Sequence, residues 1–359
     1  MDEIQEMDLK PSLYGLTEEE IKKVVEEKKF PAYRATQLIG WLYGKHIADL
    51  KEAGNLPSDL KDSLSLDYSL LTLTPCEKKA SRDKQSIKYL FCDRDGKILE
   101  SVLIVQKDRR TICVSTQLGC KIKCVFCASG KGKFERSLTC GEIIEQIAWI
   151  ERETKEKATN VVFMGMGEPL DNFEAVMKAL EILAAPRGFG LGPRRITVST
   201  VGIPEKILEF VRRTKGRVRL SVSLHSAIEA TRSQLVPVNR QYSVADLKKT
   251  LLNVHRDLKR EITFEYTLIP GMNDSREEAL AAAKLAKTLK AKINLIPYNP
   301  IQEFTYPAPS REQMKKFQMI LEQKGVRVTC RQTAGRDIDA ACGQLRTRES
   351  ARNHARRET

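Results

Sequence analysis

G-C-K-I-K-C-V-F-C, residues 119–127, places Cys120, Cys124 and Cys127 at a C-x-x-x-C-x-x-C spacing. A cubane [4Fe-4S] cluster is normally held by four cysteine thiolates. Three cysteines would therefore leave one iron with an open coordination position. The spacing predicts a cluster whose open iron binds a substrate or a cofactor.

The same thiols also admit a zinc site. Structural zinc prefers closed, four-coordinate sites, and Cys113 is the candidate for a fourth ligand. The spacing favours the open-iron cluster but leaves both interpretations open.

Short apolar, β-branched runs alternate with helical stretches from Thr111 onward. The six runs are 112–115, 160–164, 196–199, 220–224, 262–266 and 293–296. Such alternation is typical of a parallel sheet covered by helices. The sequence therefore predicts an α/β fold, a partial (β/α)6 barrel, with a last strand over 326–330.

Polar or glycine-rich residues follow each predicted strand. Besides the cysteine run, these segments are 165–168, 200–202, 225–226, 270–271 and 298–300. Active sites of such barrels lie at the carboxyl ends of the strands. We expect these segments to meet in one site.

The chain before the barrel is predicted to contain helices and then a hairpin. Thr17 and Glu20 form a capping-box pattern that begins a helix, and a second helix is expected over 33–43. Strands 87–91 and 98–105 flank a turn. The predicted divisions are an N-terminal helical accessory domain (1–65), a β-hairpin connector (66–110), the barrel (111–335) and a C-terminal segment (336–359).

Length and composition describe a globular enzyme-sized chain. Its 359 residues exceed the roughly 250–300 at which single cores stop growing. No apolar stretch approaches the roughly 20 residues of a membrane helix, and the acidic N-terminus lacks signal-peptide features. We expect a cytoplasmic monomer whose nine cysteines are ligands, catalysts or core residues and not a disulfide framework.

The charge is strongly positive and unevenly distributed. The formal net charge is +14, while residues 1–60 carry 8 Lys and Arg against 12 Asp and Glu, so residues 61–359 carry +18. Such an excess favours a polyanionic partner, most simply nucleic acid. A solvated basic surface is the alternative.

Some conspicuous residues are not expected to function. The lone thiols are predicted to be core or bystander residues: Cys76, Cys92, Cys140 and Cys330. Three histidines are predicted to lie on the surface or on helix faces: His46, His255 and His354. The glycine-rich segment 188–193 precedes a strand instead of following one, so we interpret it as a loop and not a dinucleotide site.

The C-terminal block D-I-D-A-A-C-G-Q-L, residues 337–345, carries Cys342 next to Gly343. Together with Cys113, the three-cysteine run, G-M-G-E-P-L at 165–170 and S-L-H at 223–225, it resembles the RlmN/Cfr family of radical S-adenosylmethionine (SAM) RNA methyltransferases. The resemblance spans roughly residues 98 to 345. Pro169 resembles the RlmN branch, which methylates C2 of adenine.

The resemblance implies a two-stage mechanism with one [4Fe-4S] cluster and two SAM molecules per turnover. Cys342 is methylated by the first SAM, and the second is cleaved reductively to a 5′-deoxyadenosyl radical that activates the methylthio group for addition to adenine. Cys113 then attacks the sulfur of Cys342, releasing the product and leaving a Cys113–Cys342 disulfide. Glu100 aligns with the acceptor of the C2 proton, although a lone strand glutamate is more often simply solvated. Flavodoxin or ferredoxin would supply electrons.

The resemblance also implies a set of SAM contacts. Glu168 would bind the amino group, residues 199 and 223–225 the ribose and carboxylate, and Asn299 the adenine end. The full set is Gly167, Glu168, Ser199, Ser223, Leu224, His225 and Asn299.

The implied substrate is an adenosine of 23S rRNA at the peptidyl-transferase centre, together with the adenosine next to the tRNA anticodon. Its base must be single-stranded or flipped out, because a duplex hides the edge of adenine. Two alternatives stay open. One is Cfr-type methylation at C8, and the other is a non-enzymatic zinc-binding RNA-binding protein, which leaves the Cys342 block unexplained.

Overall fold

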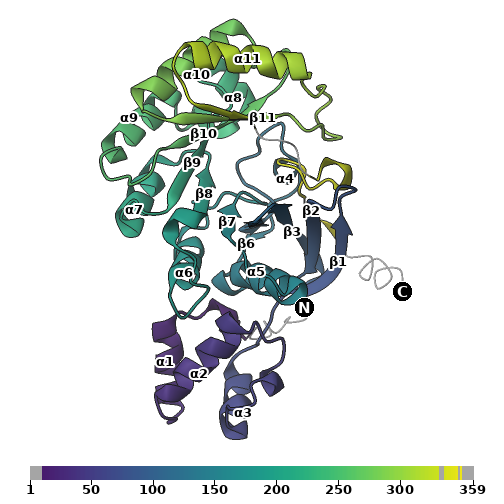
Figure 1. Ribbon diagram of the computed structural model, residues 1–359, viewed down its shortest axis with the longest axis vertical. Coiled ribbons are helices and arrows are strands. Elements are labelled where there is room, and N and C mark those ends of the chain that lie inside the picture. Colours follow the sequence, from purple (N-terminus) through teal and green to yellow (C-terminus); the bar gives the residue numbers. More distant parts are fainter. Residues whose placement is uncertain (1–9, 331–334, 347, 350–359) are drawn as a thin grey trace, which may run out of the picture.

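A computed structural model describes residues 10–330, 335–346 and 348–349, and its centre is a parallel sheet (Figure 1). All six predicted strands are confirmed and lie side by side in chain order. They are β4 (Arg109–Val114), β7 (Asn160–Phe163), β8 (Ile196–Thr200), β9 (Arg219–Ser223), β10 (Thr263–Leu268) and β11 (Lys292–Pro297). The predicted last strand, β12 (Val328–Cys330), pairs in parallel with β11.

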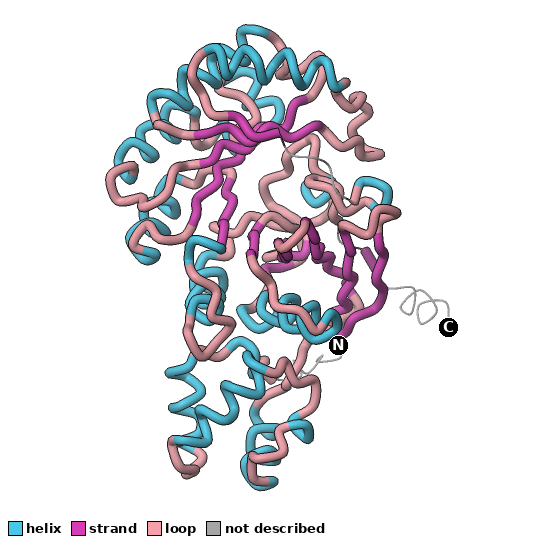
Figure 2. Tube along the Cα trace, in the orientation of Figure 1, coloured by secondary structure: helices cyan, strands magenta, loops and turns pink. Residues whose placement is uncertain are grey.

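Helices cover the convex face of this sheet and leave the concave face to the site (Figure 2). They are α5 (Cys140–Thr154), α6 (Phe173–Ala184), α7 (Pro204–Thr214), α8 (Glu229–Leu235), α9 (Val244–Val254), α10 (Arg276–Thr288) and α11 (Arg311–Gln323). Short 3-10 turns lie at Pro193–Arg195, Pro237–Arg240 and Arg336–Ile338. The curved sheet with helices outside confirms the predicted α/β barrel architecture.

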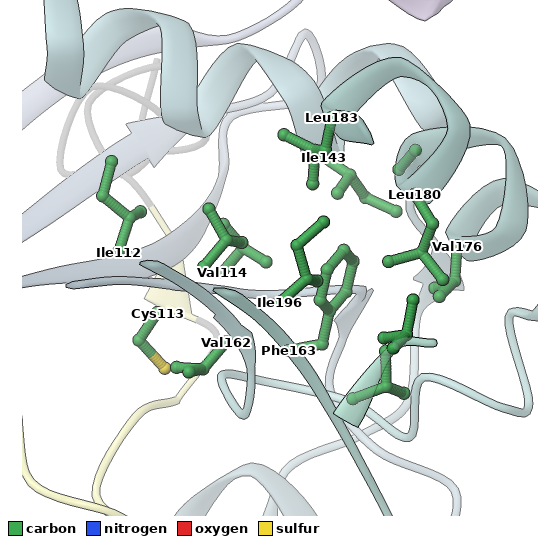
Figure 3. Close-up of a cluster of buried hydrophobic side chains, with 14 of the residues drawn as sticks. Ile112, Cys113, Val114, Ile143, Val162, Phe163, Val176, Leu180, Leu183 and Ile196 are labelled. Carbon is green, nitrogen blue, oxygen red and sulfur yellow. The ribbon is translucent and has the colours of Figure 1, made fainter. Parts of the chain in front are cut away.

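Strand alternation separates the apolar core from the inner face. Figure 3 shows Ile112, Val114 and Phe163 pointing towards the side chains of α5 and α6, while Cys113 and Val162 point to the opposite face. Because successive strand residues face opposite sides, one run of sequence supplies both the core and the site.

Four antiparallel strands extend the sheet beyond β4. The predicted hairpin is confirmed as β2 (Ser86–Cys92) and β3 (Lys97–Gln106), and the short β13 (Arg348–Glu349) also pairs with β3. At the edge lies β1 (Thr74–Ala80), whose residues are all exposed. The sequence does not predict β1, because it lacks the apolar alternation that marks a half-buried strand.

Pairing of β1 with β2 overturns one expectation about the thiols. Cys76 and Cys92 are joined in a disulfide, with their Cα atoms 6.0 Å apart. The sequence predicts two unconnected core or bystander residues, because the cysteines are 16 positions apart and no pattern predicts β1. Of the other two, Cys140 is a buried core residue as predicted, and Cys330 is exposed.

The N-terminal helical module packs against α5. It contains a 3-10 turn (Leu13–Gly15), α1 (Glu18–Glu27), α2 (Tyr33–Ile39), a π-helical turn (Gly40–Gly44), a 3-10 turn (Leu50–Glu52) and α3 (Ser58–Asp67). The capping box of Thr17 and Glu20 is present at the start of α1, as predicted. Its apolar residues join the same continuous core as the barrel.

His46 corrects a second expectation. It was predicted to lie on the surface, yet it is only 4% exposed and lies between the module and α5. Its Nε2 atom lies 2.8 Å from Glu151 Oε2 and 2.7 Å from Lys157 Nζ. His255 is partly buried at the end of α9, and His354 lies outside the described residues.

The segment 188–193 forms a loop between α6 and β8, as predicted. Among the described residues, no helix has the length and apolar character needed to cross a bilayer.

Candidate active site

The concave face of the sheet encloses a cavity of about 600 Å³. Alternate strand residues line it and make it polar, among them Thr197, Ser221 and Asn294. Cys113 borders it from β4, and Cys127 and Cys342 border it from two loops at its rim. The structure therefore brings three predicted site cysteines to one cavity.

The three-cysteine run lies in a loop closed by a short two-stranded ribbon. β5 (Gln117–Leu118) pairs with β6 (Arg136–Ser137), and α4 (Ala128–Lys131) begins directly after Cys127. The loop folds back on itself at Gly130, where a Cβ atom would lie 3.0 Å from the backbone of Lys123 and Cys124. Only glycine allows this close approach.

Burial disfavours free thiolates in this loop. Burial, and then the negative charge of Cys127, raise the pKa of Cys120 to about 12. The pKa of Cys124 is raised well above its ordinary value by burial and then by the charges of Cys127 and Cys120. These thiols are thus close enough to repel one another as anions, and a cationic group between them would remove that cost.

The arrangement fits a cubane cluster better than zinc. Backbone N–H groups of Ser129 and Gly130 point at the sulfur of Cys127 and partly offset the effect of burial on its pKa, and such N–H···S bonds are typical of iron–sulfur sites. In the described parts of the chain, no three His, Cys, Asp or Glu side chains converge on a point where they could hold one metal ion. Zinc needs that convergence, whereas each thiolate of a cubane binds a different iron.

Glu168 ends a tight loop after β7. Gly167 has φ +100, and a Cβ there would lie 2.6 Å from Gln117. The carboxylate of Glu168 accepts N–H bonds from Leu170 (3.0 Å) and Val201 (2.8 Å). Burial raises its pKa to about 7, although these hydrogen bonds oppose the shift.

The ends of β8 and β9 bring the next predicted contacts together. The hydroxyl oxygens of Ser199 and Ser223 lie 3.4 Å apart. Leu224, by contrast, buries its side chain in the apolar core, and its amide donates to the carbonyl of Glu265 (3.0 Å). Only its backbone therefore lies near the predicted SAM contacts.

His225 connects β9 to the cysteine loop. Its Nδ1 atom accepts the N–H of Thr267 (3.1 Å), and its ring meets Phe126 edge-on, with the centroids 4.6 Å apart. Burial, and then the charge of Arg232, lower its pKa to about 3. His225 is therefore neutral and carries its proton on Nε2.

Arg232 and Gln117 position the site but were missed in the sequence. The buried guanidinium of Arg232 donates to the carbonyls of Val201 (2.7 Å) and Leu224 (3.1 Å), tying two strand ends together. Gln117 accepts the N–H of Glu168 (2.9 Å). Nothing in their local sequence marks either residue, since both contact partners distant along the chain.

Asn299 contacts the Cys342 loop at the cavity rim. Its Nδ2 atom donates to the carbonyl oxygen of Cys342 (3.2 Å). Its Oδ1 atom is buried and accepts no hydrogen bond within the described part of the chain. Since buried acceptors are normally paired, this atom fits a ligand donor such as the amino group of adenine.

The Cys342 loop is bound to the cysteine run. Gly343 accepts the amide N–H of Ala128 (2.7 Å), and the Ser129 hydroxyl donates to the carbonyl of Leu345 (2.6 Å). Cys342 also contributes to the raised pKa of Cys127. Cys113 is buried, and Cys342 is partly exposed.

Glu100 lies on β3 and is fully buried, so the solvated alternative is wrong. Its Oε1 atom lies 3.4 Å from Lys88 Nζ, and its Oε2 atom accepts the N–H of Arg346 (3.2 Å). Glu100 does not line the cavity. On β3, Val102 and Ile104 do line the cavity, and Glu100 shares their face because alternate strand residues point to the same side.

Comparison with known proteins matches both parts of the chain. The radical SAM superfamily matches residues 114–283, and the ribosomal RNA large subunit methyltransferase N-terminal domain matches residues 12–69. The crystal structure of a radical SAM methyltransferase from Sphaerobacter thermophilus superposes with a TM-score of 0.90 at 40% identity, covering 94% of this chain and 99% of that one.

Two relatives align over nearly their full length. The probable dual-specificity RNA methyltransferase RlmN of Geobacillus thermodenitrificans is 40% identical over 342 residues, 94% of this chain and 93% of that protein. The dual-specificity RNA methyltransferase RlmN of Aliarcobacter butzleri is 40% identical over 359 residues, 96% of this chain and 98% of that protein.

Fold and matches together define the class as radical SAM, which implies a [4Fe-4S] cluster and SAM. Within that class, the chain belongs to the RlmN family of RNA methyltransferases. The resemblance stated from its motifs is confirmed.

Proposed function

We propose that this chain methylates C2 of adenosine in 23S rRNA and in tRNA next to the anticodon, in the cytoplasm where these RNAs lie. The observation that carries the proposal is the single cavity bordered by Cys113, Cys127 and Cys342. A methyl carrier, a resolving thiol and a cluster ligand would thereby meet around one substrate base.

Cys120, Cys124 and Cys127 are the residues proposed to hold the cluster. When bound, one cluster and two SAM molecules per turnover supply a methyl group and a 5′-deoxyadenosyl radical. The apolar surroundings of Phe126, Val201 and Leu235 would exclude water from this reaction.

The protein's own thiols carry the carbon and release it. Cys342 would take the methyl group on its sulfur, and the fixed loop around Gly343 would hold that sulfur towards the cavity. Cys113 would attack the sulfur of Cys342, so that the carbon–sulfur bond breaks and a disulfide forms. Cellular dithiols would then reduce this disulfide.

Glu100 is the proposed acceptor of the C2 proton. It lies on β3, hydrogen-bonded to the strand that carries Cys113, and Lys88 would stabilise its charged form. Glu100 does not itself line the cavity, so the proton would reach it through an intervening polar group.

The proposed SAM contacts lie on neighbouring strand ends. Glu168 would accept hydrogen bonds from the SAM amino group beside Gly167, and Asn299 Oδ1 would accept one from adenine. Ser199, Ser223, the backbone of Leu224 and the Nε2–H of His225 would contact the ribose and carboxylate.

The positive charge of residues 61–359 would bind the RNA backbone. The adenine must leave its stack to reach Cys342. An electron donor such as flavodoxin or ferredoxin is the further partner of the reaction.

The test is anaerobic incubation of the reconstituted protein with SAM, a reductant and protein-free rRNA or tRNA. Mass spectrometry of the nucleosides should show 2-methyladenosine. A product of 8-methyladenosine would establish the Cfr-type reaction instead, and no methylated adenosine would refute the proposal.

Two cysteine variants test the assigned roles. Cys342→Ala should bind RNA but form no methylcysteine and no covalent complex. Cys113→Ala should stall with RNA attached through Cys342, giving a slow, nuclease-sensitive band on a denaturing gel. Cys140→Ala, which changes a core thiol remote from the cavity, is the control and should behave as the parent protein.

A further inference from the structure

The loop that carries the three cysteines also carries four lysines. Lys121, Lys123, Lys131 and Lys133 are all exposed, and the same loop contains one acidic residue, Glu135. We call these four lysines the lysine rim.

Two contacts make the rim one surface. A Cβ atom at Gly119 would lie 2.2 Å from the carbonyl oxygen of Lys133, and one at Gly130 would lie 3.0 Å from the Cα of Lys123. The two limbs of the loop therefore run against each other. This brings together segments of the loop whose lysines are up to 12 positions apart in sequence.

Much of the rim's charge is available to a partner. Lys121 pairs with Asp171 (3.0 Å) and Lys133 lies 3.8 Å from Glu135. Within the described parts of the chain, Lys123 and Lys131 have no carboxylate within ion-pair distance. Half-buried Ile122 and Phe134 lie next to these lysines along the chain, and Lys121 Nζ lies 4.6 Å from the centroid of the Phe134 ring.

The rim is separate from the lining of the cavity that would receive the RNA base. Cys127 and Ser129 border that cavity, but none of the four lysines lines it. Cys120 and Cys124 do not line it either, and both are partly exposed. The loop therefore contributes Cys127 and Ser129 to the cavity, while its four exposed lysines lie outside the cavity lining.

We propose that the lysine rim docks an acidic protein that donates one electron at a time to the cluster. This inference rests on the proposed reductive cleavage of SAM, which needs an electron from outside the chain. Encounters between redox proteins are small, under about 1,200 Å², and depend on complementary charge for their rate and orientation. The lysine rim lies in the same loop as the cluster thiols, together with half-buried Ile122 and Phe134. Such a basic surface fits an acidic redox partner.

The test compares two charge reversals in the full-length, anaerobically reconstituted protein. The test variant is Lys131→Glu with Lys133→Glu. The control is Lys248→Glu with Lys249→Glu, which makes the same change of charge at exposed positions on α9. Binding of a purified acidic flavodoxin is measured calorimetrically at low and high salt, and the rate of cluster reduction by the reduced flavodoxin is followed by absorbance.

The rim variant should bind flavodoxin at least about tenfold more weakly at low salt and reduce its cluster correspondingly more slowly, while the control keeps parental values. Dithionite needs no docking surface, so 5′-deoxyadenosine production with dithionite should stay within about twofold of the parent. Unchanged flavodoxin binding in the rim variant would overturn the proposal. Weakened RNA binding with intact flavodoxin binding would also overturn it and make the rim an RNA surface.

Failure of the proposed function gives a different result. A parent protein that forms no 5′-deoxyadenosine with dithionite would refute reductive SAM cleavage, whatever the flavodoxin measurements show.

Discussion

The amide N–H of Ala128 donates a 2.7 Å hydrogen bond to the carbonyl oxygen of Gly343. Ala128 follows Cys127, and Gly343 follows Cys342. One backbone bond therefore sets the spacing between a proposed cluster ligand and the proposed methyl carrier. Movement of either loop would be transmitted to the other.

Gly343→Ala should disturb this spacing. Gly343 has φ +84, and a Cβ would lie 3.3 Å from the carbonyl oxygen of Phe126. The strain should cost about 1–2 kcal/mol locally and slow methylation of Cys342 roughly tenfold in a single-turnover assay. Gly132→Ala is the control, because a Cβ there meets nothing within 4 Å. Equal rates in both variants would contradict a positioning role for Gly343.

Replacement of a proposed cluster ligand should abolish the cluster. Cys124→Ala should lose bound iron and 5′-deoxyadenosine production, because only three thiols are assigned to the cluster. Cys140→Ala, at a core thiol that does not line the cavity, should keep both. Iron analysis after anaerobic reconstitution checks this, and full iron in Cys124→Ala would show that the ligand set is wrong.

Glu168 should make the unliganded protein less stable as the pH rises. Its pKa is about 7 in the folded protein against 4.5 unfolded, so the folded state binds more protons between these values and stability falls as pH rises through them. Glu168→Gln removes this dependence. The variant should gain on the order of 3 kcal/mol relative to the parent between pH 4.5 and 8, measured by denaturant unfolding of the apo proteins. A parallel pH profile for the two proteins would refute the raised pKa.

Glu151→Gln should loosen the N-terminal module. Burial alone would raise the pKa of Glu151, but hydrogen bonds from His46 and Ala158 and the charge of Lys157 lower it overall. A lowered carboxyl pKa stabilises the fold above the ordinary value and loses this effect as pH falls through the folded value. The variant should lose about 2 kcal/mol at neutral pH.

The loss should shrink as the pH falls below 4.5, the ordinary pKa of glutamate, because Glu151 is then protonated in the unfolded parent and its stabilising effect on the folded state decreases. Denaturant unfolding at pH 7 and pH 4 measures the difference. Glu156→Gln removes an exposed ion pair with Arg110 and should change stability little. If the two variants change the free energy of unfolding equally, the contact between His46 and Glu151 stabilises the fold no more than an exposed ion pair does.

The barrel could be predicted because its strands carry their own signal. Parallel strands are covered on their outer face and therefore read as apolar, β-branched runs, as β8 and β10 do. Thr17 and Glu20 predicted the start of α1 because a capping box is a local interaction. Helices and strands that are specified by residues close together in the chain could thus be predicted from the sequence.

Features that depend on distant partners were not predicted. His46 lies against Glu151, 105 residues away, and Arg232 on α8 donates to the carbonyl of Val201, 31 residues away. β1 is recognisable only through its pairing with β2, and the Cys76–Cys92 disulfide follows from that pairing. The roles of the site residues remain predictions that the variants above test.

The sheet runs from β1 at one end to β12 at the other, and within the described residues these end strands do not pair with each other. A closed barrel fills its interior with packed side chains and admits only what fits between its loops. An open barrel sets no limit on the size of a substrate that stays outside and inserts one group into the interior. Access then depends on the inserted group and not on the size of the whole substrate. A single exposed base on a folded polymer is enough to enter the site.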